Sequence, residues 1–343
     1  MAYAGTERSY NKGFHIPDPV YFTGSALLYS IIILVLLYVS SLFNNPWTTY
    51  DVGRFYAMAE GIVNGATPYL GEYADPKPPL IFFTLAVPTL LGQAYLGGLL
   101  LVGVCNFVSA VLVMKMGWNL YGRFSGFLAG LLFTINIAWA QGYFVLTEPF
   151  TVMFVLLGTY ALMFTDLRYR YLMAGLSIGL GIGFKQYAAF ILPVVLYYMY
   201  RNGELKKIPE LLTGILLPLF LIFALFFLFY GNEAGMASIY WSFGVSADYV
   251  SQSNAGGVPS YRPDNPVMYV ANLVFAISIF TSLLIFAAAS YIKDRPVTAY
   301  EHYFCIAAAA FASTILIRQY LHYWILALPF IALLCARLFR DNR

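Results

Sequence analysis

Charged residues are scarce in this chain, and six of them fall in one stretch, TTYDVGRFYAMAEGIVNGATPYLGEYADPKPPL, at residues 48–80. They are Asp51, Arg54, Glu60, Glu72, Asp75 and Lys77. A carboxylate at a boundary between apolar and aqueous surroundings can act as a general base, and a lysine there can hold a phosphate as a point charge. We predict these roles for Asp51 and Lys77 and expect most of the other four to solvate the loop. A helix cap for Asp51 and a snorkelling lysine at 77 are the structural alternatives.

Four further ionisable side chains interrupt apolar runs: Glu148 in GYFVLTEPF, Lys185 in GLGIGFKQYAAF, and Arg318 with His322 in IRQYLHYW. Glu148 is predicted to be a second active-site carboxylate, or else only a favourable charge at a helix start. An ionisable residue at the depth of Lys185 is a functional hypothesis, with a turn between two spans as the alternative. Arg318 suggests an anion site, and His322 follows one helical turn later, although a lone histidine is more often structural.

The composition defines the class of protein that carries these residues. Of 343 residues, 61% are hydrophobic and 10% are charged, and the mean hydropathy is +0.72. Soluble domains carry about 25% charged residues, so the sequence predicts an all-α polytopic membrane protein. A net charge of +3 does not indicate nucleic-acid binding. The chain has no HExxH, Walker or GxSxG motif, and its three cysteines and three histidines are scattered, so we expect no metal and no cofactor.

Long apolar runs predict about ten transmembrane helices. We expect apolar segments at 24–43, 79–92, 95–117, 124–142, 146–164, 170–184, 186–200, 208–230, 267–292, 299–317 and 320–338. The run 79–92 is short and begins at a double proline, so it is predicted to be half-inserted. Residues 51–63 carry spaced apolar positions before Asn64-Gly65 and predict an interfacial amphipathic helix with Asp51 at its cap position.

Basic residues are distributed unequally between the two sides of this arrangement. With both termini inside, fourteen lysines and arginines fall on the inner side and five on the outer side, as the positive-inside rule requires. We therefore predict a plasma-membrane protein with cytoplasmic termini and an outer active site. Residues 1–343 are expected to form one transmembrane domain, with 44–78 as the first outer loop, which carries the catalytic residues, and 231–266 as a second outer loop that covers the bound substrates.

Aromatic residues lie near the same outer level. Tyr143, Phe144, Tyr240, Trp241 and Tyr261 could stack on a bound substrate, or they could form an interfacial aromatic belt.

The first-loop pattern, Asp51 followed by FYAMAEGIVNGATPY and then DPKPPL, resembles the GT-C glycosyltransferase superfamily. The likeness is to the branch of the protein O-mannosyltransferases and the lipid A aminoarabinose transferase. TEPF at 147–150, GLGIGFKQ at 179–186 and RQYLHYWILALPFIALL at 318–334 follow in order over most of the chain. The chain ends at its last predicted span, so the resemblance is to a compact prokaryotic member, archaeal members included, without a soluble C-terminal domain.

The resemblance implies an inverting transferase that moves a monosaccharide from a polyprenyl-phosphate carrier, dolichyl or undecaprenyl, to a hydroxyl acceptor. Asp51 would be the base, Lys77 the phosphate ligand, Lys185 and Arg318 further phosphate contacts, and Glu148 the second acidic residue. The acceptor stays open between a lipid-linked glycan, a protein and a membrane lipid. A transporter or lipid-sugar flippase is the competing prediction, although the sequence lacks the inverted repeats that such a protein would be expected to show.

Overall fold

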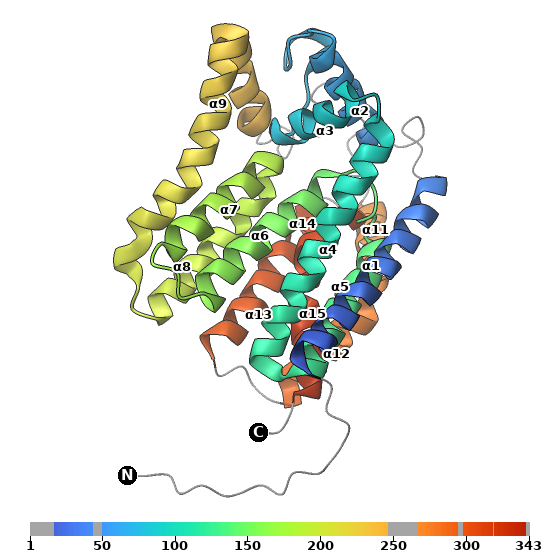
Figure 1. Ribbon diagram of the computed structural model, residues 1–343, viewed down its shortest axis with the longest axis vertical. Helices are drawn as coiled ribbons and strands as arrows, with labels where there is room; N and C mark the ends of the chain where they lie inside the picture. Colours follow the sequence, from blue (N-terminus) through green and yellow to red (C-terminus); the bar gives the residue numbers. More distant parts are fainter. Residues whose placement is uncertain (1–16, 44–49, 246–265, 294–297, 318, 341–343) are drawn as a thin grey trace, which may run out of the picture.

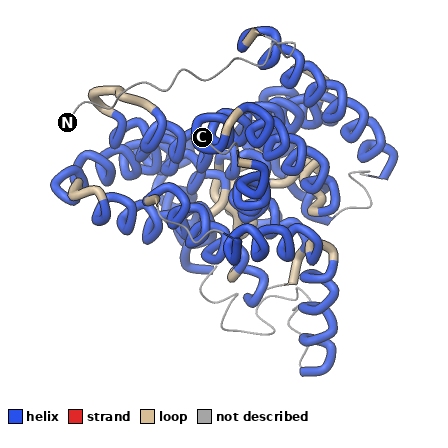
Figure 2. Tube along the Cα trace, turned by 90° about the horizontal axis from the view of Figure 1, so that it is seen from below, coloured by secondary structure: helices blue, strands red, loops and turns tan. Residues whose placement is uncertain are grey.

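In the computed structural model, which describes residues 17–43, 50–245, 266–293, 298–317 and 319–340, the described segments are helices joined by turns and short loops (Figure 1, Figure 2). The α-helices are α1 (Asp18–Phe43), α2 (Tyr50–Val63), α3 (Leu80–Leu90), α4 (Ala94–Tyr121), α5 (Arg123–Trp139), α6 (Thr147–Phe164), α7 (Arg170–Phe184), α8 (Leu192–Arg201), α9 (Ile208–Ile239), α11 (Pro266–Ser278), α12 (Thr281–Lys293), α13 (Ala299–Ala312), α14 (Thr314–Ile317) and α15 (Trp324–Ala336). The sequence prediction of an all-α polytopic fold is confirmed.

Six described helical segments are long and apolar enough to cross a membrane, and a seventh span is added if α11 and α12 count as one. The helices α3, α5 and α7 are apolar but shorter, at 11 to 17 residues. The chain is therefore a multi-pass membrane protein, while the total of ten spans remains a prediction.

Three predicted segments differ in detail from the structure. The run 267–292 is two helices bent by 68° between Ser278 and Thr281, because two turn residues break the helix there. The run 186–200 begins as the 3-10 helix η2 (Gln186–Ile191) before α8. Residues 231–245, predicted as part of an outer loop, are helical, and 246–265 lie outside the described residues.

The reversal at Gly231 explains how helix α9 ends over the bundle. Gly231 has φ +80°, a left-handed conformation that glycine adopts without steric cost. A Cβ at Gly235 would lie 2.5 Å from the Phe227 ring, so the chain has turned back on itself. The returning segment runs toward α3 and ends in the π-helix η4 (Tyr240–Gly244) (Figure 1).

Small residues bring α7 and α9 into backbone contact. A Cβ at Gly175 would lie 2.2 Å from the Leu211 carbonyl oxygen, and one at Gly214 would lie 2.4 Å from the Leu172 carbonyl oxygen. Gly175, Gly179 and Gly183 repeat every four residues along α7, the small-xxx-small pattern that lets membrane helices approach closely. This contact fixes the end of α7, where Lys185 follows.

The helix ends form two sets of contacts, and each set contains segments that the sequence predicts to lie on the same side of the membrane. At one end, Gln186 reaches the carbonyl oxygens of Pro76 and Ser242, and Gln141 reaches His322. At the opposite end, Ser125 donates to the Phe339 carbonyl oxygen, and Arg170 pairs with Glu204. The segments predicted to share the outer side thus meet one another, as do those predicted to share the inner side.

Candidate active site

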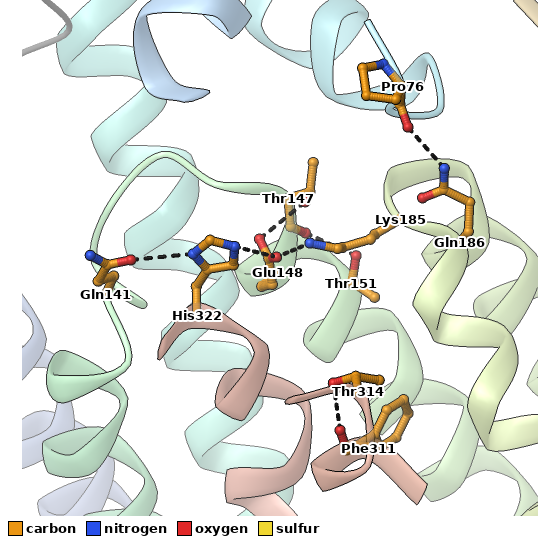
Figure 3. Close-up of polar contacts among 10 residues, drawn as sticks. All are labelled: Pro76, Gln141, Thr147, Glu148, Thr151, Lys185, Gln186, Phe311, Thr314 and His322. Carbon is orange, nitrogen blue, oxygen red and sulfur yellow. Dashed lines mark hydrogen bonds and ion pairs between the residues drawn. The ribbon is translucent and has the colours of Figure 1, made fainter. Parts of the chain in front are cut away.

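A buried ion pair lies at the end of the bundle where Gln186 contacts Pro76 and Ser242 (Figure 3). Glu148 stands in the first turn of α6, and Lys185 follows the last residue of α7. The Lys185 ammonium donates to Glu148 Oε1, and the side chains of Lys185 and Glu148 are 4% and 2% exposed. Pro149 suits a first helical turn, and an acidic side chain there is stabilised by the helix dipole. The ion pair thereby joins the start of α6 to the end of α7, 37 positions apart in the sequence.

The Glu148 carboxylate has further partners around it. His322 Nε2 lies 3.6 Å from Glu148 Oε1, and His322 Nδ1 lies 3.2 Å from Gln141 Oε1. The Thr147 hydroxyl donates to Glu148 Oε2 across 3.1 Å. Figure 3 shows these side chains converging on Glu148 from three segments of the chain. Every partner restrains the carboxylate, as a buried charge requires.

Aromatic rings enclose the ammonium of Lys185. Its Nζ lies 4.4 Å from the ring centre of Tyr323 and 5.2 Å from that of Tyr187, and these two rings meet edge to face. The Tyr320 ring stacks on His322 with 5.1 Å between centres. Ring faces attract a cation at these distances. Lys185 is therefore held by one carboxylate and two rings.

The DPKPPL loop is anchored to this cluster by Gln186. The Gln186 side-chain amide donates to the Pro76 carbonyl oxygen across 2.9 Å and to the Ser242 carbonyl oxygen across 2.5 Å. The loop that carries Lys77 thus lies beside the end of α7. The charges of Asp51 and Lys77 act on both Lys185 and His322, so the five predicted ionisable side chains of this region share one electrostatic neighbourhood.

Asp75 corrects the expectation that the first-loop charges merely solvate the loop. Its side chain is 4% exposed, and Asp75 Oδ2 accepts from Arg54 Nε across 2.8 Å. Asp75 Oδ1 also accepts the backbone N–H of Lys77 across 3.0 Å. Burial raises the pKa of Asp75 despite the opposing charges of Lys77 and Arg54. Asp75 and Arg54 therefore shape the turn that presents Lys77.

Tyr69 stabilises the same turn through a hydrogen bond to the backbone of Lys77. It has φ +69°, and its hydroxyl donates to the Lys77 carbonyl oxygen across 2.6 Å. The ring is 1% exposed and packs edge to face against Phe82 and Phe226. Burial raises the pKa of the Tyr69 phenol, so this group stays a neutral donor. The position of Lys77 is thus fixed by buried partners on both of its neighbouring peptide units.

The remaining predicted residues divide into three outcomes. Asp51 is the second residue of α2, inside the first turn rather than at the cap position. Tyr240 is exposed and Trp241 half-buried on η4, so their sugar contacts stay predictions. Arg318 and Tyr261 lie outside the described residues.

Tyr143 is placed differently from its prediction. Its ring is fully buried, and its hydroxyl donates to the Thr134 carbonyl oxygen across 2.9 Å. That position leaves the ring no face for a sugar, so Tyr143 is a core residue here. The local sequence could not show which way the side chain points.

Sequence reasoning also missed Gln141, Gln186 and Tyr323, which hold the charged residues in place. Each is adjacent in sequence to a feature that was singled out, and Gln186 follows Lys185 directly. A signal for Gln141 is its φ of +60°, which marks a constrained turn, but only the structure reveals it. Among the described residues, no three histidine, cysteine, aspartate or glutamate side chains gather as metal ligands. The expectation that no metal is needed is untested.

The site lies at one end of an all-helical membrane bundle, and comparison with known proteins defines its class. Residues 76–240 match the family model described as dolichyl-phosphate-mannose-protein mannosyltransferase. The match begins at Pro76, so it includes Lys77, Glu148 and Lys185 but not Asp51. No curated protein matches the chain.

A solved structure shares the architecture, and a second crystal structure of the same protein is less similar. The crystal structure of ArnT from Cupriavidus metallidurans bound to undecaprenyl phosphate is 14% identical, with a TM-score of 0.57 over 92% of this chain. The apo structure of the same protein is 13% identical, with a TM-score of 0.43 over 92% of this chain and 77% of its own. This chain spans 60% of the length of the undecaprenyl-phosphate-bound ArnT. The bound-state likeness shows a shared fold.

The fold is that of the GT-C glycosyltransferases. Together with the match of residues 76–240 to the mannosyltransferase family model, the shared fold makes the chain similar to ArnT and the protein mannosyltransferases, the branch that the first-loop pattern resembles.

Proposed function

We propose that this protein is an inverting glycosyltransferase that moves a monosaccharide from a polyprenyl-phosphate carrier to a hydroxyl acceptor. One observation carries the proposal. The Gln186 hydrogen bond to Pro76 brings the Lys77 loop against the end of α7, where Lys185 lies. Two cations from distant segments, with the Asp51 carboxylate in the same electrostatic neighbourhood, form an arrangement suited to a lipid phosphate and a general base.

The chemistry of the step follows from these groups. The acceptor oxygen attacks C1 of the sugar while Asp51 takes its proton, and the bond between C1 and the phosphate oxygen breaks. The electron pair leaves with the polyprenyl phosphate, whose charge Lys77 is proposed to contact and the buried ammonium of Lys185 to offset without touching it. A single displacement inverts the anomeric configuration. Arg318 is proposed as a further phosphate contact, and Tyr240, Trp241, Tyr261 and His322 as substrate contacts.

Glu148 has a different role in this proposal. Its carboxylate is 2% exposed and is engaged by Lys185, His322 and Thr147. We assign it the positioning of Lys185, since a carboxylate in that state offers no open face to an acceptor. Its role as a second catalytic carboxylate is thus the less favoured of the two predictions.

The donor class rests on the relative bound to undecaprenyl phosphate and on the match to the dolichyl-phosphate-mannose family. We propose an undecaprenyl- or dolichyl-phosphate sugar as donor, and a lipid-linked glycan, a protein or a membrane lipid as acceptor. The site is proposed to face the outer side of the plasma membrane, with both termini in the cytoplasm, on the strength of the basic-residue asymmetry.

The test is transfer from a panel of radiolabelled polyprenyl-phosphate sugars into membrane extract, followed by chromatography of the lipid and protein fractions. Asp51→Asn is expected to abolish transfer while the protein still folds. Glu60→Gln, also on α2 but exposed, is the matched control and is expected to keep activity. Full activity of Asp51→Asn sinks the general-base assignment. Movement of a lipid-linked sugar across sealed liposomes without a covalent product would favour the flippase.

A further inference from the structure

A narrow apolar groove opens between three helices away from the candidate active site. It has a volume of about 240 Å³. Eleven residues line it, ten from α12, α13 and α15 and one, Arg337, from the 3-10 helix η6 (Arg337–Phe339). Five of these eleven are alanines, and the small side chains of facing helices leave the slot between them. Because α13 and α15 are membrane-spanning candidates, the natural filling of such a slot is hydrocarbon.

Charged groups gather where this groove reaches the helix ends. Arg337 is 3% exposed, its Nε donates to Glu301 Oε1 across 2.8 Å, and its Nη1 donates to the Ser290 carbonyl oxygen across 3.3 Å. Arg340 Nη1 lies 3.8 Å from the same Glu301 oxygen, with its side chain 48% exposed. Lys293 is exposed one helical turn after Ser290. Two arginines thus approach one carboxylate, which leaves a positive surplus, and the exposed Lys293 ends the neighbouring helix α12.

Two hydroxyl groups near these charges lack partners. The Ser290 and Tyr121 hydroxyl oxygens are buried and make no hydrogen bond within the part of the chain that the structure describes. Tyr121 interacts electrostatically with Glu301, Arg337 and Arg340, so it belongs to the same cluster. Buried hydroxyls normally find a partner. Both hydroxyls belong to the charged end of the bundle, although neither lines the groove.

We propose that this groove binds one acyl chain of an anionic phospholipid, whose phosphate is held by Arg340 and Lys293. Hydrocarbon walls that end in surplus positive charge select an amphiphile with an anionic head, and basic pockets between membrane helices bind such headgroups. Ser125 donates to the Phe339 carbonyl oxygen beside this cluster, at the end of the bundle opposite Asp51 and Lys77. The site is therefore separate from the candidate active site and independent of the proposed transfer reaction.

The test uses the full chain, purified in detergent and stripped of lipid, with native mass spectrometry to count retained lipids. Phosphatidylglycerol and phosphatidylcholine with identical acyl chains are the two probes. We expect phosphatidylglycerol to bind more tightly. The double variant Lys293→Gln/Arg340→Gln is expected to weaken its binding about fivefold for each charge removed, with phosphatidylcholine unchanged. Arg201→Gln, an exposed arginine at the end of α8 and outside the groove, is the control and should change neither.

Ala309→Phe tests the groove itself, since this residue is exposed and lines it. It is expected to lower the binding of both lipids without lowering the thermal unfolding midpoint. Equal binding of the two lipids by the unmodified chain overturns the proposal. So does an Ala309→Phe variant that changes the oligomeric state but not lipid binding, because the groove would then be a protein interface. Preferential retention of undecaprenyl phosphate over phosphatidylglycerol would overturn the assignment to a phospholipid.

Discussion

Lys185 and Glu148 face each other across the gap between the end of α7 and the start of α6, and both are almost completely buried. Removing either partner leaves an uncompensated charge in an apolar setting, which costs about 3–5 kcal/mol. We expect Glu148→Gln and Lys185→Met each to lower the free energy of unfolding by this order. The double variant should be less destabilised than the sum of the two, as measured by unfolding in mixed detergent micelles. Additive losses would show that the two side chains do not interact.

A substitution of Gln186 is expected to weaken the binding of the lipid-phosphate sugar more than it destabilises the fold. Gln186→Leu removes the donor to Pro76 and Ser242 and leaves two carbonyl oxygens without this partner, a loss of about 1–3 kcal/mol. Since the Lys77 loop is then less well fixed, KM for the lipid-phosphate donor should rise about tenfold or more. Gln93→Leu, at an exposed position before α4, is the control. An unchanged KM in Gln186→Leu would separate this contact from donor binding.

Asp75 is expected to make the stability of the folded protein depend on pH, and the burial of its carboxyl group determines the sign of that dependence. Its pKa is raised in the folded state, so the folded protein binds the proton more tightly than the unfolded chain does. The contribution to stability is present below the ordinary pKa of 3.8 and is lost as pH rises from there through the raised value. We expect thermal unfolding midpoints across this range to fall more steeply for the natural chain than for Asp75→Asn. Parallel profiles would contradict the shift.

Tyr143 distinguishes a packing role from a sugar contact. Tyr143→Phe keeps the buried ring and removes the hydroxyl that donates to Thr134, so we expect a stability loss of about 1–3 kcal/mol. Activity per folded molecule should stay unchanged, whereas Trp241→Ala is expected to raise KM if the rings of η4 contact sugar. A selective loss of sugar affinity in Tyr143→Phe would restore the sequence-based interpretation.

The glycine contacts between α7 and α9 predict a further loss of stability. Gly214→Ala puts a Cβ 2.4 Å from the Leu172 carbonyl oxygen, so the two backbones must separate. We expect a loss of about 1–3 kcal/mol and reduced transfer, because Lys185 moves with the end of α7. Gly24→Ala, with open space around its Cβ, is the control. Equal unfolding midpoints for the two variants would refute the close approach.

Much of the fold follows from the sequence because each apolar run is bounded by residues that end helices. The double proline before Leu80 and the Asn64-Gly65 pair predicted element ends within a residue or two of those observed. The bend between Ser278 and Thr281 was not predicted, since only the two residues Ile279 and Phe280 separate the helices and both are apolar. Local hydropathy cannot show a change of direction without a change of composition.

The candidate site was predictable in its residue types but not in its pairings. Asp51, Lys77, Glu148 and Lys185 stood out because ionisable residues are rare in this chain. Their partners depend on the packing of distant segments. Glu148 and Lys185 are 37 positions apart in the sequence, so their contact could not be predicted from local patterns. Asp75 was expected to be solvated for the same reason, because Arg54 reaches it from 21 residues earlier.

The backbone contact between α7 and α9 has a consequence for chimeric proteins. Lys185 and Gln186 follow α7, while η4 follows α9, and the Gln186 bond to Ser242 joins the two ends. The glycines allow no side chain to adjust the spacing of the two helices. A transplant of the η4 segment alone from a related enzyme would therefore lose its register with Lys185. The smallest interchangeable module is the whole block from α7 to η4.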